Sequence, residues 1–490
     1  MSTYLHGAYG SIGAAGTKEA AQSMNAIVYI GTAPVHTTPG GAARVNTPVL
    51  LNNMADARRY LGYSADWDKY TLCEAMYVHF ELNNVGPLVM INVLDPAAHK
   101  ADEGGSVTQK PVNGRVMIAN AGDIVLDSVK VTGLTAGKDY TLAYDHAKEC
   151  LIITEAVSDT FGSDTMTITY DTVDPAKVDA ADVIGTSDGE GMNTGLHALA
   201  NVYQTTGFIP SHLLAPKFSS DPEVHAAMIR LANKVNAHWD VYVRADIPLE
   251  DADGEKITLS SAREWKDEHG YNQSNETVYF PMVMGTDDRI YHISVLAAAN
   301  LEKLLSTQDG IPYKTPSNTE CSIIRNLYMG EDSVNRVYDD ELINQQLNRY
   351  GIASAAYAGG RWVIWGFHSA DYTADTGDLI NIAETNRMML YYVSNDFQHR
   401  RIRDVDKPMT INDLRTIVAQ EQARLDALVK IGALIYGKVN LDASTISRSD
   451  IVNGDFSFTF DITTTPQAKS LKVIVNWTDV GYMTYYEGVA

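Results

Sequence analysis

Apolar runs that suit buried strands alternate with helical stretches along most of this chain, and this order constrains its fold more than any other feature. The apolar runs lie at 26–31, 88–94, 212–218, 239–248, 278–285 and 361–367. The helical stretches lie near 54–61, 72–82, 222–235, 260–269, 293–305 and 340–350. Strands that alternate with helices form a mostly parallel sheet covered on both faces. The sequence therefore predicts an α/β core.

One helix of this core has a clear start signal. Asp221 is a favourable N-cap residue, and Pro222 follows it at the first helical position, where a missing N–H is tolerated. Val224, Met228, Leu231 and Val235 then recur with helical spacing. We predict a helix that begins at Pro222.

A different texture interrupts the core pattern between 107 and 172. Short alternating runs there are separated by Gly, Asp and Asn turns, which is typical of an all-β module. The α/β pattern resumes afterwards. We therefore predict a discontinuous core domain at 26–95 and 183–370, and an inserted, acidic, peripheral β domain at 96–182.

The two ends of the chain differ from the core. Residues 1–25 are small, with glycines at a strict spacing of three, and are predicted to form an arm. Residues 371–490 are predicted to form an α+β domain. Its long amphipathic helix is expected from Thr410, with Asp413 completing a capping box, to about Tyr436. Two alternating strands follow, over 456–462 and 471–477.

Charge, cysteine content and hydropathy exclude several classes of protein. The net charge of −23 opposes non-specific nucleic-acid binding, and we expect no direct nucleic-acid partner. Three scattered cysteines indicate neither a disulfide framework nor a zinc site. No apolar run is long enough for a membrane span, and the N-terminus lacks the pattern of a secretory leader.

Nothing in the sequence indicates catalysis. The glycines between Gly7 and Gly16 lack the strand, helix and acidic residue of a dinucleotide fingerprint. The carboxylates at 264–268 and the adjacent His269 have no second histidine at ligand spacing. We predict no enzyme activity, no catalytic or metal-binding residues and no cofactor.

A basic cluster stands out in the acidic chain. It consists of Arg400, Arg401, Arg403 and Lys407, with Asp404 and Asp406 among them. One interpretation is a surface stretch that is paired internally. The other is an electrostatic contact with an acidic partner surface.

Both ends could take part in strand exchange. Two terminal strands with one apolar face each are marginal by themselves. Strands supplied by neighbouring molecules would stabilise them through main-chain hydrogen bonds.

The order of these parts resembles the tail sheath proteins of contractile-tailed bacteriophages and R-type tailocins, which belong to the contractile injection systems. The resemblance covers nearly the whole chain. Its motifs are HGAYG and AIVYIGTAP near the start, GMNTGLHAL, GRWVIWG followed by a helix with Asn386-Arg387, and KVIVNWTDV near the end.

The resemblance implies a non-enzymatic structural subunit that polymerises with itself as stacked hexameric rings into a helical sleeve. The sleeve would surround an inner tail tube protein and contract to drive it through a cell envelope. Baseplate and tail terminator proteins are the other implied partners, without membrane insertion. The implied location is the virion tail or a tailocin particle, assembled in the cytoplasm of the bacterial host.

By position, the resemblance also implies roles for particular residues. The four cations of the basic cluster are candidates for contact with the tube. The inserted domain faces outward, and the arms add strands to sheets of neighbouring subunits. The residues predicted for this exchange are Tyr4, Gly7, Tyr9, Gly10, Ile12, Leu471, Val473, Val475, Trp477 and Tyr482.

Two other classes of protein stay open at this point. One is an α/β enzyme with a β appendage, and the other is a monomeric surface-binding protein that uses its acidic β module as an adhesin. A bound small molecule would favour the enzyme, and monomeric behaviour at high concentration would favour the surface-binding protein.

Overall fold

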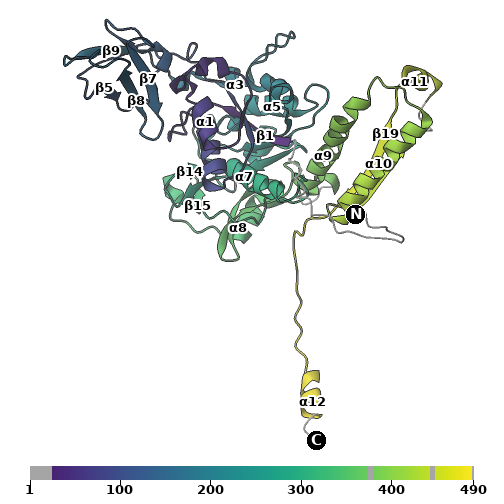
Figure 1. Cartoon of the computed structure of the whole chain (residues 1–490). Coiled ribbons are helices and arrows are strands. Elements are labelled where there is room, and N and C mark those ends of the chain that lie inside the picture. The colour runs from purple at the N-terminus through teal and green to yellow at the C-terminus, as the bar shows by residue number, and fades with distance from the viewer. Residues whose placement is uncertain (1–24, 374–378, 442–446, 488–490) are drawn as a thin grey trace, which may run out of the picture. The chain divides into compact units, whose positions relative to one another are not determined.

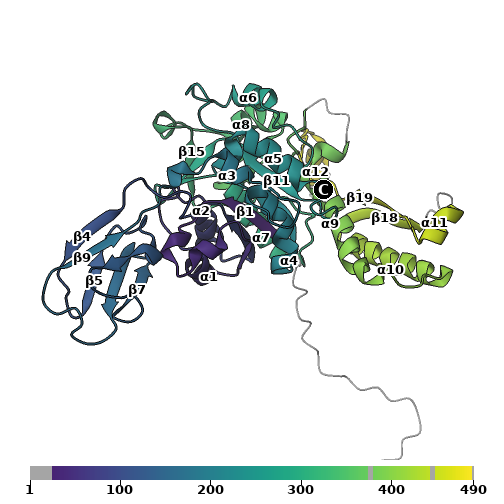
Figure 2. The ribbon, with the colours of Figure 1, turned by 90° about the horizontal axis from the view of Figure 1, so that it is seen from above.

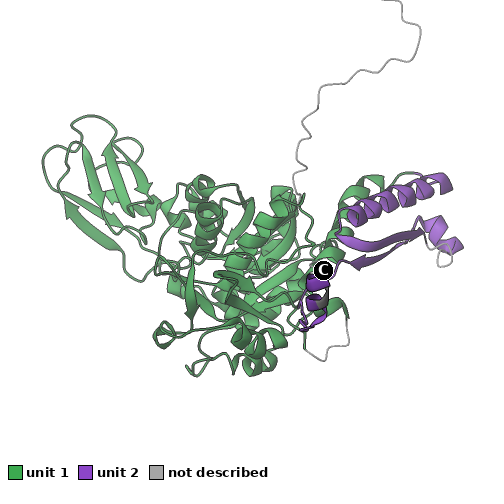
Figure 3. Ribbon diagram, turned by 90° about the horizontal axis from the view of Figure 1, so that it is seen from below, with its two compact units in different colours: residues 1–407 green, residues 408–490 purple. Residues whose placement is uncertain are grey.

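The computed structural model describes residues 25–373, 379–441 and 447–487 of the chain. The predicted arm residues Tyr4, Gly7, Tyr9, Gly10 and Ile12 lie outside these ranges. Two compact units can be distinguished, one before and one after the boundary between Lys407 and Pro408 (Figure 3). The predicted domain boundaries at 95, 182 and 370 stay predictions.

The first unit is built on an eight-stranded mixed sheet (Figure 1). The strand order is β17-β16-β12-β11-β10-β1-β3-β2. The strands from β16 to β3 pair in parallel, whereas β17 and β2 join the two edges antiparallel. Their bounds are β1 (Asn25–Gly31), β2 (Val49–Leu51), β3 (Leu88–Asn92), β10 (Ile209–Leu214), β11 (Tyr242–Asp246), β12 (Glu276–Tyr279), β16 (Ile352–Ala358) and β17 (Arg361–Trp365).

Helices connect and cover these strands (Figure 2). α5 begins as predicted, because the Asp221 side chain accepts from the N–H groups of Glu223 and Val224 and Pro222 takes the first position. The helices of this unit are α1 (Met54–Tyr60), α2 (Leu72–Met76) continued by the π-helical turns η3 (Tyr77–Leu82), α3 (Ala180–Ile184), α4 (Val202–Thr206), α5 (Pro222–Ala232), α6 (Ala262–Glu268), α7 (Ile293–Ser306), α8 (Asp340–Gln346) and α9 (Glu384–Arg401). The predicted α/β class with a mostly parallel sheet is confirmed.

The apolar run at 278–285 does not form one strand. It divides between β12 of the large sheet and β13 (Met282–Gly285), which forms a separate antiparallel sheet with β14 (Ile290–Tyr291) and β15 (Ile324–Tyr328). β16 completes the large sheet from a run of small residues that lacks a strong strand signal. Periodicity therefore found the core strands but not their assignment to sheets.

The β-rich stretch forms two small antiparallel sheets, β4-β9-β6 and β5-β8-β7, which enclose an apolar core of their own. Their strands are β4 (Gly105–Gln109), β5 (Arg115–Ile118), β6 (Lys130–Val131), β7 (Tyr140–Asp145), β8 (Cys150–Glu155) and β9 (Met166–Tyr170).

This module is bonded to the core at several points. Asp123 accepts from Lys69 Nζ at 2.9 Å and from the Tyr70 hydroxyl at 2.8 Å. Ser64 Oγ donates to Glu149 at 2.8 Å. His36 Nε2 donates to the Gly122 carbonyl at 2.7 Å, and burial lowers the pKa of His36 to about 4, so this ring is neutral at pH 7.

The second unit combines α10 (Ile411–Lys430), β18 (Leu434–Leu441), α11 (Arg448–Asn453), β19 (Phe458–Thr464) and α12 (Val480–Glu487). Thr410 and Asp413 form the predicted capping box at the start of α10. The helix ends earlier than predicted, however. Gly432 has a φ of 81°, the left-handed conformation that terminates helices, and the chain turns into β18 before Tyr436.

The prediction of a strand at 471–477 is also corrected. β19 pairs antiparallel with β18, and residues 471–477 form neither strand nor helix. Three residues separate β18 from the end of helix α10, so a tight turn brings β18 back along the helix, and it supplies the partner of β19. Tyr482 lies in α12, so it is helical and not part of a strand.

Candidate assembly segments

The C-terminal segment is unusual in exposing a row of large apolar side chains. Leu471 is 93% exposed, Val473 81%, Val475 85% and Trp477 80%. Apolar residues at every second position fit a strand that buries one face, and Ile474, which is 73% exposed, adds one apolar side chain to the other face. In the described residues this segment has no such partner, so its sequence is suited to a surface that another molecule would supply.

α12 continues the exposed apolar surface. Val480, Tyr482, Tyr485 and Tyr486 are each more than 60% exposed. Tyrosine is common at interfaces because its ring can be buried while its hydroxyl finds a partner. The segment 471–477 together with α12 is called the C-terminal arm below.

The ribbon of β18 and β19 packs on α10. Leu414, Ile417, Leu425 and Leu428 form the buried stripe of that helix. In β19 the predicted alternation holds, because Phe458, Phe460 and Ile462 are half-buried while the residues between them are exposed.

The basic cluster is largely paired within its own stretch. Asp404 accepts from Arg401 at 3.2 Å and from Lys407 at 3.1 Å. Arg400 contacts Asp396 at 3.0 Å, one turn earlier in α9. Arg403 is exposed and forms no ion pair with any residue that the structure describes. Three of the four cations therefore pair with acidic residues of their own stretch, as the first interpretation of the cluster predicts.

At the carboxyl edge of the large sheet, where parallel α/β sheets commonly bind ligands, the chain's own side chains fill the space. Ligands bind such sheets outside the carboxyl ends of the strands, where the strand order reverses, which here is between β1 and β10. Directly after β1, the Thr32 N–H donates to Thr71 Oγ1 at 3.2 Å and the Ala33 N–H to Asn92 Oδ1 at 2.8 Å. The backbone donors that could hold a phosphate there are already bonded.

A buried acid–histidine cluster lies near the same edge. His292 Nδ1 is 2.6 Å from one carboxylate oxygen of Glu74, and the backbone N–H of His292 donates to the other oxygen at 2.7 Å. Burial alone lowers the pKa of His292, but Glu74 and then Asp246 more than offset this and raise it to about 9. Burial raises the pKa of Asp246, which bonds Ser294 at the start of α7. These contacts join α2, β11 and α7.

A second buried ion pair fixes α9 to the sheet. Arg244 of β11 lies 3.0 Å from Glu384 at the start of α9, and both side chains are buried. Thr277 and Thr315 donate to the two Glu384 oxygens at 3.0 and 2.6 Å. Arg244 also donates to the Tyr279 hydroxyl.

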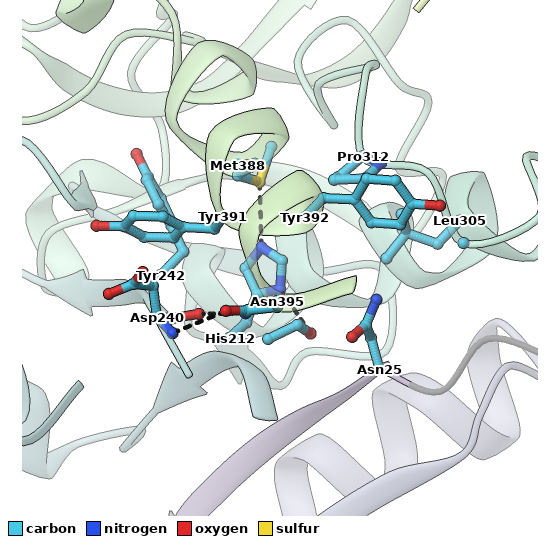
Figure 4. A pocket seen from close by; sticks show the side chains of 12 residues that line it. Asn25, His212, Asp240, Tyr242, Leu305, Pro312, Met388, Tyr391, Tyr392 and Asn395 are labelled. Carbon is cyan, nitrogen blue, oxygen red and sulfur yellow. Dashed lines mark hydrogen bonds between the residues drawn. The ribbon is translucent and has the colours of Figure 1, made fainter. Parts of the chain in front are cut away.

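A small cavity lies between α9 and the strands β10 and β11 (Figure 4). In it His212 Nε2 contacts Met388 Sδ at 3.1 Å, and Asn395 bonds both the N–H and the carbonyl of Asp240. Its volume of about 30 Å³ suits a single water and not a cofactor. Among the described residues, no group of three His, Cys, Asp or Glu side chains could hold a metal ion. None of the described helices is both long and apolar enough to cross a bilayer.

The overall fold is similar to that of known proteins. No protein-family profile matches the chain. A chain of the anti-feeding prophage baseplate superimposes with a TM-score of 0.55 at 13% identity, over 97% of this chain and 99% of that one. The contracted sheath complex of PVC, an extracellular contractile injection system, gives a TM-score of 0.52 at 11% identity, with the same two coverages. These likenesses concern the fold.

The sequence itself is similar to a curated relative. The tail sheath protein of Burkholderia phage BcepMu is 26% identical over 502 aligned residues, which cover 96% of this chain and 96% of that protein. The chain is thus a relative of the contractile tail sheath proteins, and the resemblance predicted from its motifs is confirmed.

Proposed function

We propose that this chain is the structural subunit of a contractile tail sheath, a helical sleeve that surrounds an inner tube and drives it through a cell envelope on contraction. The full-length similarity to a phage tail sheath protein carries this proposal. The fold supports it, and so does the exposed C-terminal arm, whose apolar side chains need a partner surface.

The proposed assembly is a stack of six-fold rings in a virion tail or tailocin, put together in the cytoplasm of the bacterial host. Baseplate and tail terminator proteins would bound the stack. The predicted N-terminal arm and the C-terminal arm would connect neighbouring copies by adding strands to their ribbons. Contraction would need no nucleotide, because energy can be stored in the difference between two packings of the same rigid bodies.

The arms can be tested by electron microscopy of the purified protein. The full chain is expected to form hollow tubes or stacked rings, whereas chains lacking 1–20 or 471–490 should stay folded without polymerising. Long tubes from either truncated protein would contradict strand exchange.

A matched pair of variants tests the apolar alternation directly. Val473→Asp with Val475→Asp should abolish assembly, because both side chains are placed for burial in a partner. Lys472→Asp with Asn476→Asp changes the two polar positions of the segment and should leave assembly intact. Equal behaviour of the two double variants would contradict the proposed role of the segment.

The contact with the inner tube is proposed for the basic cluster, with Arg403 as the cation most available for it. Arg403→Glu should weaken binding to purified tube protein, while sheath self-assembly stays unchanged. Lys110→Glu, in the β module, is the control and should not change tube binding. If Arg403→Glu binds the tube protein with unchanged affinity, the basic cluster does not contact the tube.

A further inference from the structure

One edge of the β18–β19 ribbon is closed by a side chain from α10. Gln422 Nε2 donates to the Gly437 carbonyl at 3.0 Å, and Gln422 Oε1 accepts from the Val439 N–H at 2.9 Å. Gly437 and Val439 are two residues apart, so their backbone groups point to the same side of β18. Because a helix side chain occupies these groups, that side is the edge facing away from β19.

The register of the ribbon agrees with this assignment. Thr465 donates to Ala433 just before the irregularity at the start of β18. Every second residue of an antiparallel strand bonds its partner strand, so Asp461 and Thr459, like Thr465, are residues of β19 that bond β18. Lys438 and Asn440 lie opposite them and are therefore the residues of β18 that bond β19.

The Gln422 amide is held in one orientation. Its Nε2 also donates to Asp426 Oδ1 at 2.8 Å, one helical turn further along α10. A carboxylate can only accept, so this bond fixes which amide atom is the nitrogen. The oxygen is therefore directed to the Val439 N–H.

The approach of α10 to β18 depends on a missing side chain. A Cβ placed on Gly437 would lie 2.9 Å from the Cβ of Leu425, closer than packed carbons tolerate. Glycine at this position lets the helix lie close enough for Gln422 to reach the strand edge.

Exposed strand edges pair with any available strand unless something blocks them. We propose that Gln422 closes the β18 edge, so that strands from neighbouring copies join the ribbon only on the β19 side. This rests on the proposed strand exchange between sheath subunits. Gln422 is thus a positioning residue for assembly, and the partner is the 471–477 segment of a second copy.

One-sided addition has a mechanical consequence. A ribbon that accepted strands at both edges would link each copy to competing neighbours and branch the assembly. Closure of one edge leaves a single direction of growth.

The closure itself is tested by hydrogen exchange on the purified chain. Gln422→Met keeps length and helix propensity but removes the bonds, so the Val439 amide should exchange about 3- to 10-fold faster, as expected for the loss of one hydrogen bond. The amides of Lys438 and Asn440, which bond β19, are internal references. Arg415→Met, on the exposed side of α10, is the control variant. An unchanged Val439 rate in Gln422→Met would overturn the closure.

The direction of addition is tested by cross-linking two mixed proteins. One carries Val473→Cys, and the other carries either Asp461→Cys on β19 or Lys438→Cys on β18, which face each other in register. The native Cys73, Cys150 and Cys321 are buried, so mild oxidation should join only the introduced thiols. A disulfide requires Cβ atoms about 4 Å apart, so it forms only between adjacent strands.

We expect dimers from the Asp461→Cys partner and none from the Lys438→Cys partner, with Lys438→Cys dimers appearing once Gln422→Met is added. Dimers from Lys438→Cys alone would overturn the inference. If neither partner cross-links and no tubes form, the proposed sheath function fails, and the Val439 exchange rate still decides whether the edge is closed.

Discussion

Charged side chains buried inside the first unit join segments that are distant in sequence. Glu74 and His292 are 218 positions apart, and Arg244 and Glu384 are 140 apart, yet each pair is in direct contact. Neither pair belongs to a motif that spacing could reveal, and sequence analysis missed both. Their arrangement fixes helices to the sheet.

The Glu74–His292 pair should make stability depend on pH. The pKa of His292 is raised to about 9 in the folded chain, above its ordinary value, so its stabilisation is fully present below about pH 6.5 and is lost as the pH rises through 9. Glu74→Gln removes the partner, and burial then favours neutral His292. We expect the melting temperature of the wild type to fall more steeply than that of Glu74→Gln between about pH 7 and 10. Parallel pH profiles would contradict this assignment.

The Arg244–Glu384 pair should be sensitive to loss of one partner. Glu384→Ala leaves a buried guanidinium unpaired and should reduce the free energy of unfolding by about 3–5 kcal/mol in urea titrations. Arg263→Ala breaks an exposed pair with Asp267 in α6 and should change it by about 1 kcal/mol or less. If the two variants lose equal stability, the buried pair does not anchor α9.

At the scale of elements, local signals located helices better than strand partners. The N-cap at Asp221 and the capping box of Thr410 with Asp413 are contacts between residues close in sequence, and the structure has both. The partner of β19 depends on where α10 stops, and a single glycine conformation at Gly432 decides that. Strand pairing is non-local, so periodicity alone did not identify β18 as the neighbour of β19.

Gly437 gives a prediction at this scale. Gly437→Ala places a Cβ against Leu425, so α10 and β18 must separate, at a cost of about 1–3 kcal/mol as for other overpacked sites. Thermal unfolding of the second unit, monitored by hydrogen exchange of residues 411–441, should show this loss of stability. Gly481→Ala meets no atom within 4 Å and should have no such effect. Unaltered protection in Gly437→Ala would contradict the close approach.

At the scale of the whole molecule, the β module is attached by specific bonds and not only by its two chain connections. Asp123 and Glu149 of the module each accept hydrogen bonds from the core. Asp123→Ala should therefore expose the connections near 95–102 and 171–182 to faster limited proteolysis. Asp164→Ala, in an exposed turn, is the control. Equal cleavage rates would mean that the Asp123 contacts do not hold the module.

The sequence by itself determined the α/β class, most core strands and helices, the β-rich interruption and the resemblance to tail sheath proteins, because these follow from periodicity, capping residues and the order of motifs. Only the tertiary structure decided the division of 278–285 between two sheets, the pairing of β18 with β19, the buried ion pairs and the closure of the β18 edge by Gln422. Each of these joins residues whose separation along the chain carries no regular pattern. They arise when helices and strands pack, since packing brings backbone donors and buried charges to partners that local sequence does not specify.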